Sequence, residues 1–338
     1  MFSAIFTAET AAHPGAEPQL MLANPVLIVG PLNPLATSGL SAATRTLHLP
    51  EGSDQAAFLE CHAGEIEALV LARAVDVPLV DRFPRLRIIA NFGVGYDNLP
   101  TLHCASRGII VTHTPHVLTD DVADTAIALM LMAVRRFGAA ERYLRAGRWS
   151  AEGMFPLTGS LKGRTLGVLG LGRIGRAVAR RAEGFGLPIA YHDIAPAPDL
   201  SYTFHASARE LAKAVDILIA VLPGGPGTLR MVDAGVFEAL GPDGIFVNVG
   251  RGTAVDQPAL IAALQSGTIA GAGLDVYESE PGVPQALLDM EHVVLLPHVA
   301  SGSHATREAM SRLVVDNITA FFTTGKALTP VPETPNPA

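Results

Sequence analysis

Three side chains that could bind and protonate a small anion follow apolar runs in the last third of the chain. They are Arg251, Glu280 and His298. A planar guanidinium binds a carboxylate with two parallel hydrogen bonds, and an imidazole exchanges protons near neutral pH. Ligands of open α/β sheets bind where parallel strands end. The three side chains therefore predict proton-transfer chemistry on a carboxylate compound at one sheet edge.

A glycine-rich turn precedes these residues, in the segment TLGVLGLGRIG that spans 165–175. It follows an apolar strand and opens a helix, and Asp193 lies eighteen residues beyond Gly175, after a second apolar strand. This layout is typical of a dinucleotide-binding unit, in which glycines let the backbone approach a pyrophosphate and the helix N-terminus faces the phosphates. We expect Asp193 to accept hydrogen bonds from the adenine ribose. The pyrophosphate is expected at Gly170, Leu171, Gly172, Arg173 and Ile174.

The elements that must position these residues are apolar runs separated by helical stretches. The runs are continuous rather than alternating, which predicts parallel strands covered on both faces. The sequence thus predicts an α/β protein with two Rossmann-like, doubly wound parallel-sheet domains and an interdomain cleft. We expect a discontinuous, flavodoxin-like substrate domain at 1–114 and 305–338, and a dinucleotide-binding domain at 115–304. The expected strands are Val26–Val29, Leu86–Ala90, Ile109–Val111, Leu166–Leu169, Ile189–His192, Ile217–Val221, Ile245–Val249, Gly271–Val276 and Val293–Leu296.

Length and composition exclude several classes of protein. The chain has 338 residues, which suits two domains, and 49% of its residues are hydrophobic. A net charge of −8 argues against a nucleic-acid surface. Only Cys61 and Cys104 are present, which excludes a disulfide scaffold and fits a reducing cytoplasm. No group of His, Cys and Asp has the spacing of a zinc site, so we expect no metal.

One segment, 119–136, is predicted to form a long buried helix capped by Thr119 or Asp120. Its central turns are apolar nearly all round, which indicates a domain junction or a subunit interface. We therefore expect a homodimer formed through this helix. Its longest apolar run, Ala126–Val134, is too short to span a bilayer, and no membrane association is expected.

The two ends of the chain are predicted to contribute little. Residues 1–24 are interpreted as an irregular extension, and the proline-rich stretch from Pro330 to Ala338 as a loose tail. A last amphipathic helix is expected at 304–323. Trp149, the only tryptophan, is interpreted as a packing or dimer anchor.

Together these motifs resemble the D-isomer-specific 2-hydroxyacid dehydrogenase family. The resemblance covers about residues 85–320 and includes NFGVGYDN at 91–98, the segment from Thr114 to Asp124, and the three strand ends. It implies reduction of a small 2-keto acid, of the glyoxylate or hydroxypyruvate type, to the D-2-hydroxy acid with a nicotinamide cofactor. A different class also stays open, because some relatives are NAD(H)-sensing scaffolds that recruit partners with little turnover.

The resemblance implies a role for each reactive residue. Arg251 would bind the substrate carboxylate and polarise the carbonyl, and His298 would transfer the proton. Glu280 would bond the other imidazole nitrogen, and it is preferred over Glu278 because its step to proline matches the family. The backbone N–H groups of Val94 and Gly95 would hold the other side of the carboxylate. His113 and His116, near the expected hinge, are interpreted as surface or hinge residues, although either could reach the cleft.

The resemblance also implies further cofactor contacts, with Asp275 orienting the nicotinamide carboxamide. Members that prefer NADP often carry Ser or Asn followed by Arg after the second strand, where this chain has Asp193 and Ile194. NAD is therefore the expected cofactor, and NADP stays open because His192 or Arg209 could meet a phosphate. The loop LPGGPGT at 222–228 lacks the polar residues common in the family. The remaining expected contacts are Leu222, Pro223, Thr228, Val249, Gly250, His298, Ser301 and Gly302.

Overall fold

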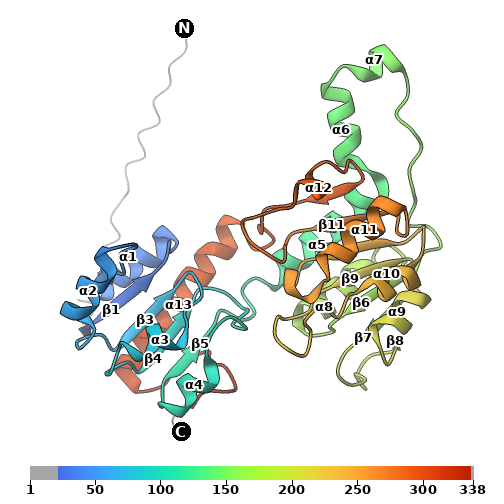
Figure 1. Cartoon of the computed structure of the whole chain (residues 1–338). Helices are drawn as coiled ribbons and strands as arrows, with labels where there is room; N and C mark the ends of the chain where they lie inside the picture. Colours follow the sequence, from blue (N-terminus) through green and yellow to red (C-terminus); the bar gives the residue numbers. More distant parts are fainter. Residues whose placement is uncertain (1–21, 336–338) are drawn as a thin grey trace, which may run out of the picture.

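Two parallel β-sheets form the centres of two lobes (Figure 1). The computed structural model describes residues 22–335. Every strand pair in both sheets is parallel, and most strands are buried along their whole length. Continuous burial explains why the strands read as unbroken apolar runs. The α/β class with two doubly wound parallel sheets is confirmed.

The first lobe contains a five-stranded sheet in the order β2-β1-β3-β4-β5. This order is that of flavodoxin-like folds. Its strands are β1 (Leu22–Val29), β2 (Thr44–His48), β3 (Ala68–Leu71), β4 (Ile88–Asn91) and β5 (Ile110–Thr112). Its helices are α1 (Pro34–Ala43), α2 (Asp54–His62), α3 (Val77–Asp81), α4 (Thr101–Ser106) and the C-terminal α13 (His304–Thr324).

The sequence did not predict β2 or β3. The edge strand β2 has the sequence TRTLH and is partly exposed, so it lacks an apolar run. The strand β3 is fully buried but only four residues long. A short apolar run of this kind cannot be told from a buried helix segment by periodicity.

The second lobe contains a seven-stranded sheet in the order β12-β11-β10-β9-β6-β7-β8. Six of these strands follow the order of dinucleotide-binding domains, and one further strand is added at the β12 edge. The strands are β6 (Leu166–Leu169), β7 (Ile189–His192), β8 (Thr203–Phe204), β9 (Ile217–Ala220), β10 (Ile245–Asn248), β11 (Gly271–Leu274) and β12 (Val293–Leu295). The helical elements are α5 (Thr119–Arg135), α6 (Phe137–Arg145), α7 (Arg148–Glu152), α8 (Arg173–Glu183), α9 (Ala208–Ala214), α10 (Ala234–Leu240), η1 (Gly252–Ala254), α11 (Gln257–Ser266) and α12 (Gln285–Leu288).

The chain crosses between the lobes twice. It passes from β5 to α5, which packs on β10 and β11, and returns from β12 to α13, which packs on α1 and β4. Figure 1 shows α13, the last helix in the described part of the chain, lying with the first lobe. The strand ends that carry the predicted site residues therefore face a region bordered by both lobes.

The helix α5 is buried within its own lobe rather than left for a partner. Its apolar residues pack against α8 and the sheet, and Arg181 of α8 bonds Asp120 and Asp124 at 2.9 and 2.6 Å. Packing within the lobe explains the apolar surface on most sides of the helix, so the dimer interface expected along it is not required. The cap prediction was also wrong, because the helix begins at Thr119 with Leu118 as its N-cap and no side-chain cap bond.

Both predictions for the chain ends need correction. Residues 22–24 belong to β1 rather than to an irregular extension, and residues 1–21 lie outside the described part. The C-terminal stretch packs on β5, where Val331 is buried and donates its N–H to the Val111 carbonyl at 2.8 Å. The Thr334 hydroxyl accepts the Val111 N–H at 3.1 Å. These hydrogen bonds tie residues 330–335 to the first lobe.

The short helices α6 and α7 project from the second lobe as an arm (Figure 1). Large apolar side chains on and beside the arm are exposed, among them Trp149 at 57% and Leu157 at 101%. Within residues 22–335, no helix combines the length and the apolar character needed to cross a bilayer.

Candidate active site

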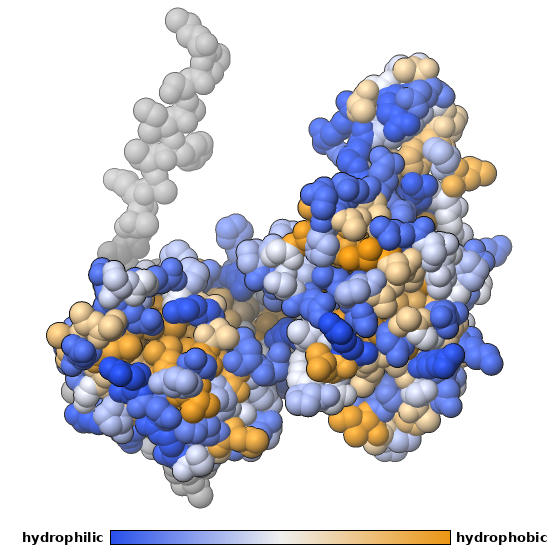
Figure 2. Space-filling view, in the orientation of Figure 1, coloured by the Kyte–Doolittle hydropathy of each residue, from blue (hydrophilic) through white to orange (hydrophobic). Residues whose placement is uncertain are grey.

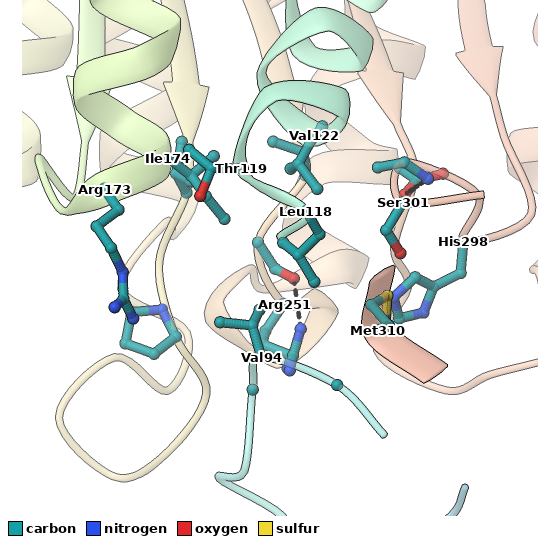
Figure 3. A pocket seen from close by; sticks show the side chains of 18 of the residues that line it. Val94, Leu118, Thr119, Val122, Arg173, Ile174, Arg251, His298, Ser301 and Met310 are labelled. Atoms are coloured by element: carbon teal, nitrogen blue, oxygen red, sulfur yellow. Dashed lines mark hydrogen bonds between the residues drawn. The ribbon is translucent and has the colours of Figure 1, made fainter. Parts of the chain in front are cut away.

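A cavity of about 710 Å³ lies between the lobes and is lined by residues of both. Figure 2 shows the hollow between the lobes, and Figure 3 shows its wall from close by. Most residues expected at the site from the sequence line it. They are Val94, Gly95, Gly172, Arg173, Ile174, Leu222, Pro223, Val249, Gly250, Arg251, Asp275, His298 and Ser301. The others, Gly170, Leu171, His192, Asp193, Thr228, Glu280 and Gly302, do not line the cavity.

Arg251 follows β10 and reaches across the cavity to the first lobe. Its Nε donates to Asp97 Oδ1 at 3.0 Å, and its Nη1 donates to the Gly250 carbonyl at 3.1 Å. The guanidinium fills the space that a side chain at Gly95 would need. Arg251 thus lies against the loop whose N–H groups were expected to face the substrate (Figure 3). The sequence reasoning assigned no role to Asp97, although it lies in the NFGVGYDN motif.

The loop LPGGPGT departs from the family pattern at the point where Asp97 approaches it. A side chain at Gly224 would overlap the Asp97 carboxylate. Glycine is therefore required there while Asp97 reaches Arg251. The Thr228 hydroxyl donates to the Pro223 carbonyl at 2.6 Å, so it supports the loop itself.

His298 and Glu280 form a hydrogen-bonded pair on the second lobe. The imidazole Nδ1 and Glu280 Oε2 are 2.6 Å apart, and Glu280 Oε1 accepts the Tyr277 N–H at 3.0 Å. Burial alone would raise the pKa of Glu280, but the hydrogen bonds from His298 and Tyr277 lower it below its usual value. Glu278 instead pairs with Arg230 at 2.8 Å. Since Nδ1 is engaged, Nε2 is the ring nitrogen left for a substrate.

Asp275 fastens the backbone that carries His298. Its two carboxylate oxygens accept the N–H groups of Val299 and Ala300 at 2.8 and 2.9 Å, and its carbonyl accepts the His298 N–H at 2.9 Å. His298 has a φ of 52°, a left-handed conformation that a non-glycine residue rarely adopts. These three hydrogen bonds hold His298 in that conformation. Burial raises the pKa of Asp275 despite its two backbone donors.

Side chains bond all three carbonyl groups of the loop at residues 93–95 and so fix its backbone. Asn91 Nδ2 donates to the carbonyls of Gly93 and Gly95 at 3.2 and 2.9 Å. His113 Nδ1 donates to the Val94 carbonyl at 2.8 Å. The N–H groups of Val94 and Gly95 are left without a partner in the described structure, residues 22–335. Successive N–H groups of this kind form a concave site for an anion.

His113 is a buried residue behind this loop rather than a surface residue, and it lies where the chain leaves β5 toward the second lobe. Only 8% of it is exposed, and its ring packs edge-on against Tyr96 with centroids 5.2 Å apart. Burial lowers the pKa of His113, which favours the neutral ring that donates from Nδ1. His116 lies nearer the second lobe, where its Nε2 accepts from Arg173 at 3.1 Å. Sequence reasoning assigned no role to Asn91 or Asp97, and it did not identify the hydrogen bond from His113 to this loop.

The glycine-rich turn forms a cradle at the N-terminus of α8. Gly170 has a φ of 89°, and a side chain at Gly175 would overlap the Gly170 carbonyl, so both positions need glycine. Gly172 is the N-cap of α8 and has open space before it. The free N–H groups of the first turn of α8 and the Arg173 side chain fit the charge of a pyrophosphate. The residues present therefore fit a dinucleotide cofactor.

The residues after β7 lie beside this cradle. Asp193 Oδ2 accepts the Leu171 N–H and Oδ1 accepts the Ile194 N–H, each at 2.7 Å. His192 Nδ1 donates to the His205 carbonyl at 2.9 Å. His192 also lines a separate hollow of about 340 Å³ together with Arg209. Within residues 22–335, no group of three or more His, Cys, Asp or Glu side chains could hold a metal ion.

Comparison with known proteins identifies the family. Residues 127–300 match the family model described as D-isomer specific 2-hydroxyacid dehydrogenase, NAD binding domain. The chain belongs to this family. The resemblance inferred from the sequence is thereby confirmed, and the chain is a nicotinamide-dependent oxidoreductase.

Relatives in this family cover most of the chain. It is 46% identical over 276 residues to a hydroxyphenylpyruvate reductase of Plectranthus scutellarioides, which covers 81% of this chain and 88% of that protein. It is 42% identical over 308 residues to a glyoxylate/hydroxypyruvate reductase A of Arabidopsis thaliana, which covers 90% and 98%.

A solved structure agrees with the fold of this dehydrogenase. An NADPH-dependent glyoxylate/hydroxypyruvate reductase from Sinorhizobium meliloti, solved with NADP and malonate, superposes with a TM-score of 0.90. It is 51% identical in sequence, and the match covers 93% of this chain and 98% of that one.

Proposed function

We propose that the chain reduces a small 2-keto acid, of the glyoxylate or hydroxypyruvate type, to the D-2-hydroxy acid. One observation carries the proposal: Arg251 and His298 line one cavity together with Val94 and Gly95, and Glu280 bonds His298 from outside that cavity. The relatives named as reductases of such acids support it. Residues 1–114 and 305–338 would form the substrate domain and residues 115–304 the cofactor domain, and the two chain crossings support these boundaries.

The residues act as follows in this proposal. The substrate carboxylate lies between the Arg251 guanidinium and the N–H groups of Val94 and Gly95. Arg251 also polarises the C2 carbonyl, since a guanidinium stabilises developing negative charge. His298 donates a proton from Nε2 to the carbonyl oxygen, and ionised Glu280 fixes the ring and stabilises the protonated imidazole. In the oxidative direction, His298 takes the proton back.

The pyrophosphate of the cofactor would be held at the N-terminus of α8 by Gly170, Leu171, Gly172, Arg173 and Ile174. The rest of the cofactor would contact residues that follow three strands: Leu222 and Pro223 after β9, Val249 and Gly250 after β10, and Asp275 after β11. When bound, a reduced nicotinamide supplies the hydride that reaches C2. Asp275 would accept a hydrogen bond from the carboxamide, in addition to its two backbone donors. Approach of the two lobes would exclude water from the cavity.

Steady-state kinetics test this function. We expect oxidation of a reduced nicotinamide with glyoxylate and hydroxypyruvate, and slower oxidation with pyruvate and phenylpyruvate. A chain that binds reduced nicotinamide tightly but consumes none with any of the four acids would be a sensor, and the proposal would fail. The hydrogen bond between Glu280 and His298 and the names of the relatives favour the enzyme over such a scaffold.

We propose that NAD is the preferred cofactor and that NADP is accepted more weakly. A carboxylate at Asp193 repels a 2′-phosphate, and the neighbouring Ile194 supplies no positive charge. The relative from Sinorhizobium meliloti is NADPH-dependent, and the hollow beside His192 and Arg209 could receive a phosphate. Titration of the purified chain with NADH and NADPH decides the matter. We expect NADH to bind about tenfold more tightly, and Asp193→Ala to narrow the difference; tighter NADPH binding would contradict the preference.

We propose a homodimer that uses the arm of α6 and α7 and not the body of α5. The arm exposes Leu144 and Trp149, and the segment that follows it exposes Met154 and Leu157. A hollow of about 460 Å³ at its base is lined by Met132 and Arg136 from the end of the predicted helix segment, together with Met290 and His292. The buried Arg136 Nε has no hydrogen-bond partner within the described residues. A second copy could supply both an apolar cover and an acceptor.

Sedimentation velocity tests the dimer. We expect Leu157→Asp to give monomers at concentrations where the wild type is dimeric, and Leu328→Asp, an exposed leucine of the other lobe, to leave the dimer intact. A monomeric wild type would contradict the proposal.

Both cysteines are free, which supports the proposal that the enzyme works in a reducing cytoplasm.

A further inference from the structure

The interlobe cavity contains two arginines that have no role in the proposed function. Four arginines line it: Arg73, Arg173, Arg251 and Arg307. In the proposed function, Arg251 binds the substrate carboxylate and Arg173 lies at the pyrophosphate. Arg73 and Arg307 have no assigned partner, in a protein whose net charge is −8.

Arg73 lies beside the loop that holds the first carboxylate. It follows β3 by two residues, as Gly93 follows β4, and the register pairs Leu71 with Asn91. Adjacent strands are roughly 4.8 Å apart, so the backbones of Arg73 and Gly93 are neighbours. The Arg73 side chain is packed against Gly30, where an added side chain would meet its Cγ at 3.0 Å. The stem of Arg73, a residue that lines the cavity, is therefore supported by the backbone at Gly30.

Arg307 approaches the same loop from the first turn of α13. Its guanidinium carbon lies 5.9 Å from the ring centroid of Phe92, the residue before Gly93. The next residue, Glu308, bonds Arg312 one turn further along. Met310, also on α13, lines the cavity near His298 (Figure 3). Arg307 thus lies next to the residue that leads into the loop.

Neither arginine has an acidic partner within residues 22–335, although most arginines of this part of the chain do. Both residues line the cavity in the region that also includes Met310, Arg73 beside Gly93 along the sheet and Arg307 next to the ring of Phe92. A substrate whose C1 carboxylate is held by Arg251 and the loop of residues 93–95 has only its far end left to reach that region. Guanidinium groups bind carboxylates and phosphates with charge-assisted hydrogen bonds.

We propose that Arg73 and Arg307 form a second anion subsite, which selects 2-keto acids that carry a second anionic group at the far end. The inference rests on the proposed function, because that function orients the first carboxylate. The enzyme therefore prefers a 2-keto dicarboxylate or a phosphorylated 2-keto acid over a neutral analogue of equal carbon number.

Matched substrates test the subsite. The ratio of kcat/KM is measured for oxaloacetate against 2-ketobutyrate and for 2-ketoglutarate against 2-ketopentanoate, since each pair differs only in the terminal group. Phosphohydroxypyruvate against hydroxypyruvate separates a phosphate from a carboxylate preference. We expect at least one ratio to exceed about ten in the wild type. That ratio should fall toward one in Arg73→Gln and Arg307→Gln and persist in Arg307→Lys.

A matched control is Arg82→Gln, an exposed arginine of the same lobe that does not line the cavity and should leave every ratio unchanged. Ratios of one or less in the wild type, or ratios that neither glutamine variant lowers, overturn the subsite while glyoxylate turnover still supports the function. If no keto acid is turned over, the proposed function fails. Titration calorimetry on the NADH-saturated chain then tests the subsite by itself. Glutarate must bind more tightly than pentanoate to the wild type, and the two affinities must become similar in Arg307→Gln.

Discussion

The two lobes contribute to the cavity in different ways. The seven-stranded lobe supplies the reactive side chains Arg251 and His298 at the ends of buried strands, and Asp275 fastens the backbone beside them. The five-stranded lobe supplies backbone N–H groups on the loop of residues 93–95. Its side chains Asn91 and His113 act only through that loop, by occupying its carbonyl groups.

In the proposed function, this difference means that the seven-stranded lobe performs the chemistry and the five-stranded lobe positions the substrate. Changes in the first should lower kcat, and changes in the second should raise KM while leaving kcat closer to that of the wild type. The pair Arg251–Asp97 joins the two lobes, with a side-chain exposure of 29% and 20%. It should show an intermediate pattern.

The largest effect is expected for His298→Gln. Loss of the proton donor should lower kcat roughly 100- to 10,000-fold, the usual range for a positioned acid. Binding of NADH, followed by fluorescence titration, should stay within about twofold of the wild type, since His298 acts on the substrate. A variant that retains most of its kcat would place the proton transfer elsewhere.

Arg251→Lys should come next. Lysine keeps the charge but loses the planar fork, so kcat/KM for glyoxylate should fall roughly 100-fold. The loss should appear in both kcat and KM, because this side chain binds the carboxylate and polarises the carbonyl. A change confined to KM would show that Arg251 only binds.

Asp97→Asn should have a smaller effect, on KM above all. The amide cannot offer the same charge-assisted acceptor to Arg251 Nε, so we expect KM to rise roughly three- to tenfold with kcat changed less. Steady-state kinetics with glyoxylate measure both constants. An unchanged KM would mean that Arg251 is held by its remaining contacts alone.

The smallest effect on KM is expected for His113→Ala and His113→Asn, which test how the five-stranded lobe positions the substrate. Alanine leaves the Val94 carbonyl without a donor and should raise KM several-fold, about as one lost hydrogen bond does, whereas asparagine can still donate and should recover part of the loss. Equal KM values for alanine, asparagine and wild type would show that Asn91 alone sets the loop.

The same position predicts a pH effect on stability. The pKa of His113 in the fold lies below its ordinary value of 6.5. The unfolded chain therefore takes up the proton first, and the stability conferred by the neutral ring is lost as the pH falls from 6.5 toward the lower pKa. The thermal midpoint of the wild type should drop more between pH 7 and pH 5.5 than that of His113→Asn. Parallel curves would contradict this assignment.

The same contrast explains what could be predicted from sequence. The seven-stranded lobe carries motifs in which residue type and spacing define the chemistry, so the glycine turn, Arg251, Glu280 and His298 could be identified before the structure. In the five-stranded lobe, the expected substrate contacts are backbone N–H groups. The sequence does not show which side chains will bond the carbonyl groups of the same loop, because those side chains come together only in the folded chain. His113 belongs to no reactive pattern, and Asp97 meets Arg251 across 154 positions of sequence.

The chain ends and the cap of α5 were mispredicted, whereas the long buried helix itself was predicted correctly. An all-round apolar helix indicates burial but not by what, and α5 is covered by its own lobe. A proline-rich tail indicates irregular backbone, yet residues 330–335 bond to β5 without regular helix or strand structure. In both segments, the residues that cover the chain are distant in sequence, so the sequence pattern alone does not identify them.

The stereochemistry of the product tests the central claim most directly. Purified enzyme is supplied with hydroxypyruvate and reduced nicotinamide, and the glycerate formed is resolved by chiral chromatography. The account predicts D-glycerate in an amount equal to the cofactor oxidised, because Arg251, His298 and the loop of residues 93–95 fix one face of the carbonyl. L-glycerate, a racemate, or cofactor oxidation without glycerate would contradict it.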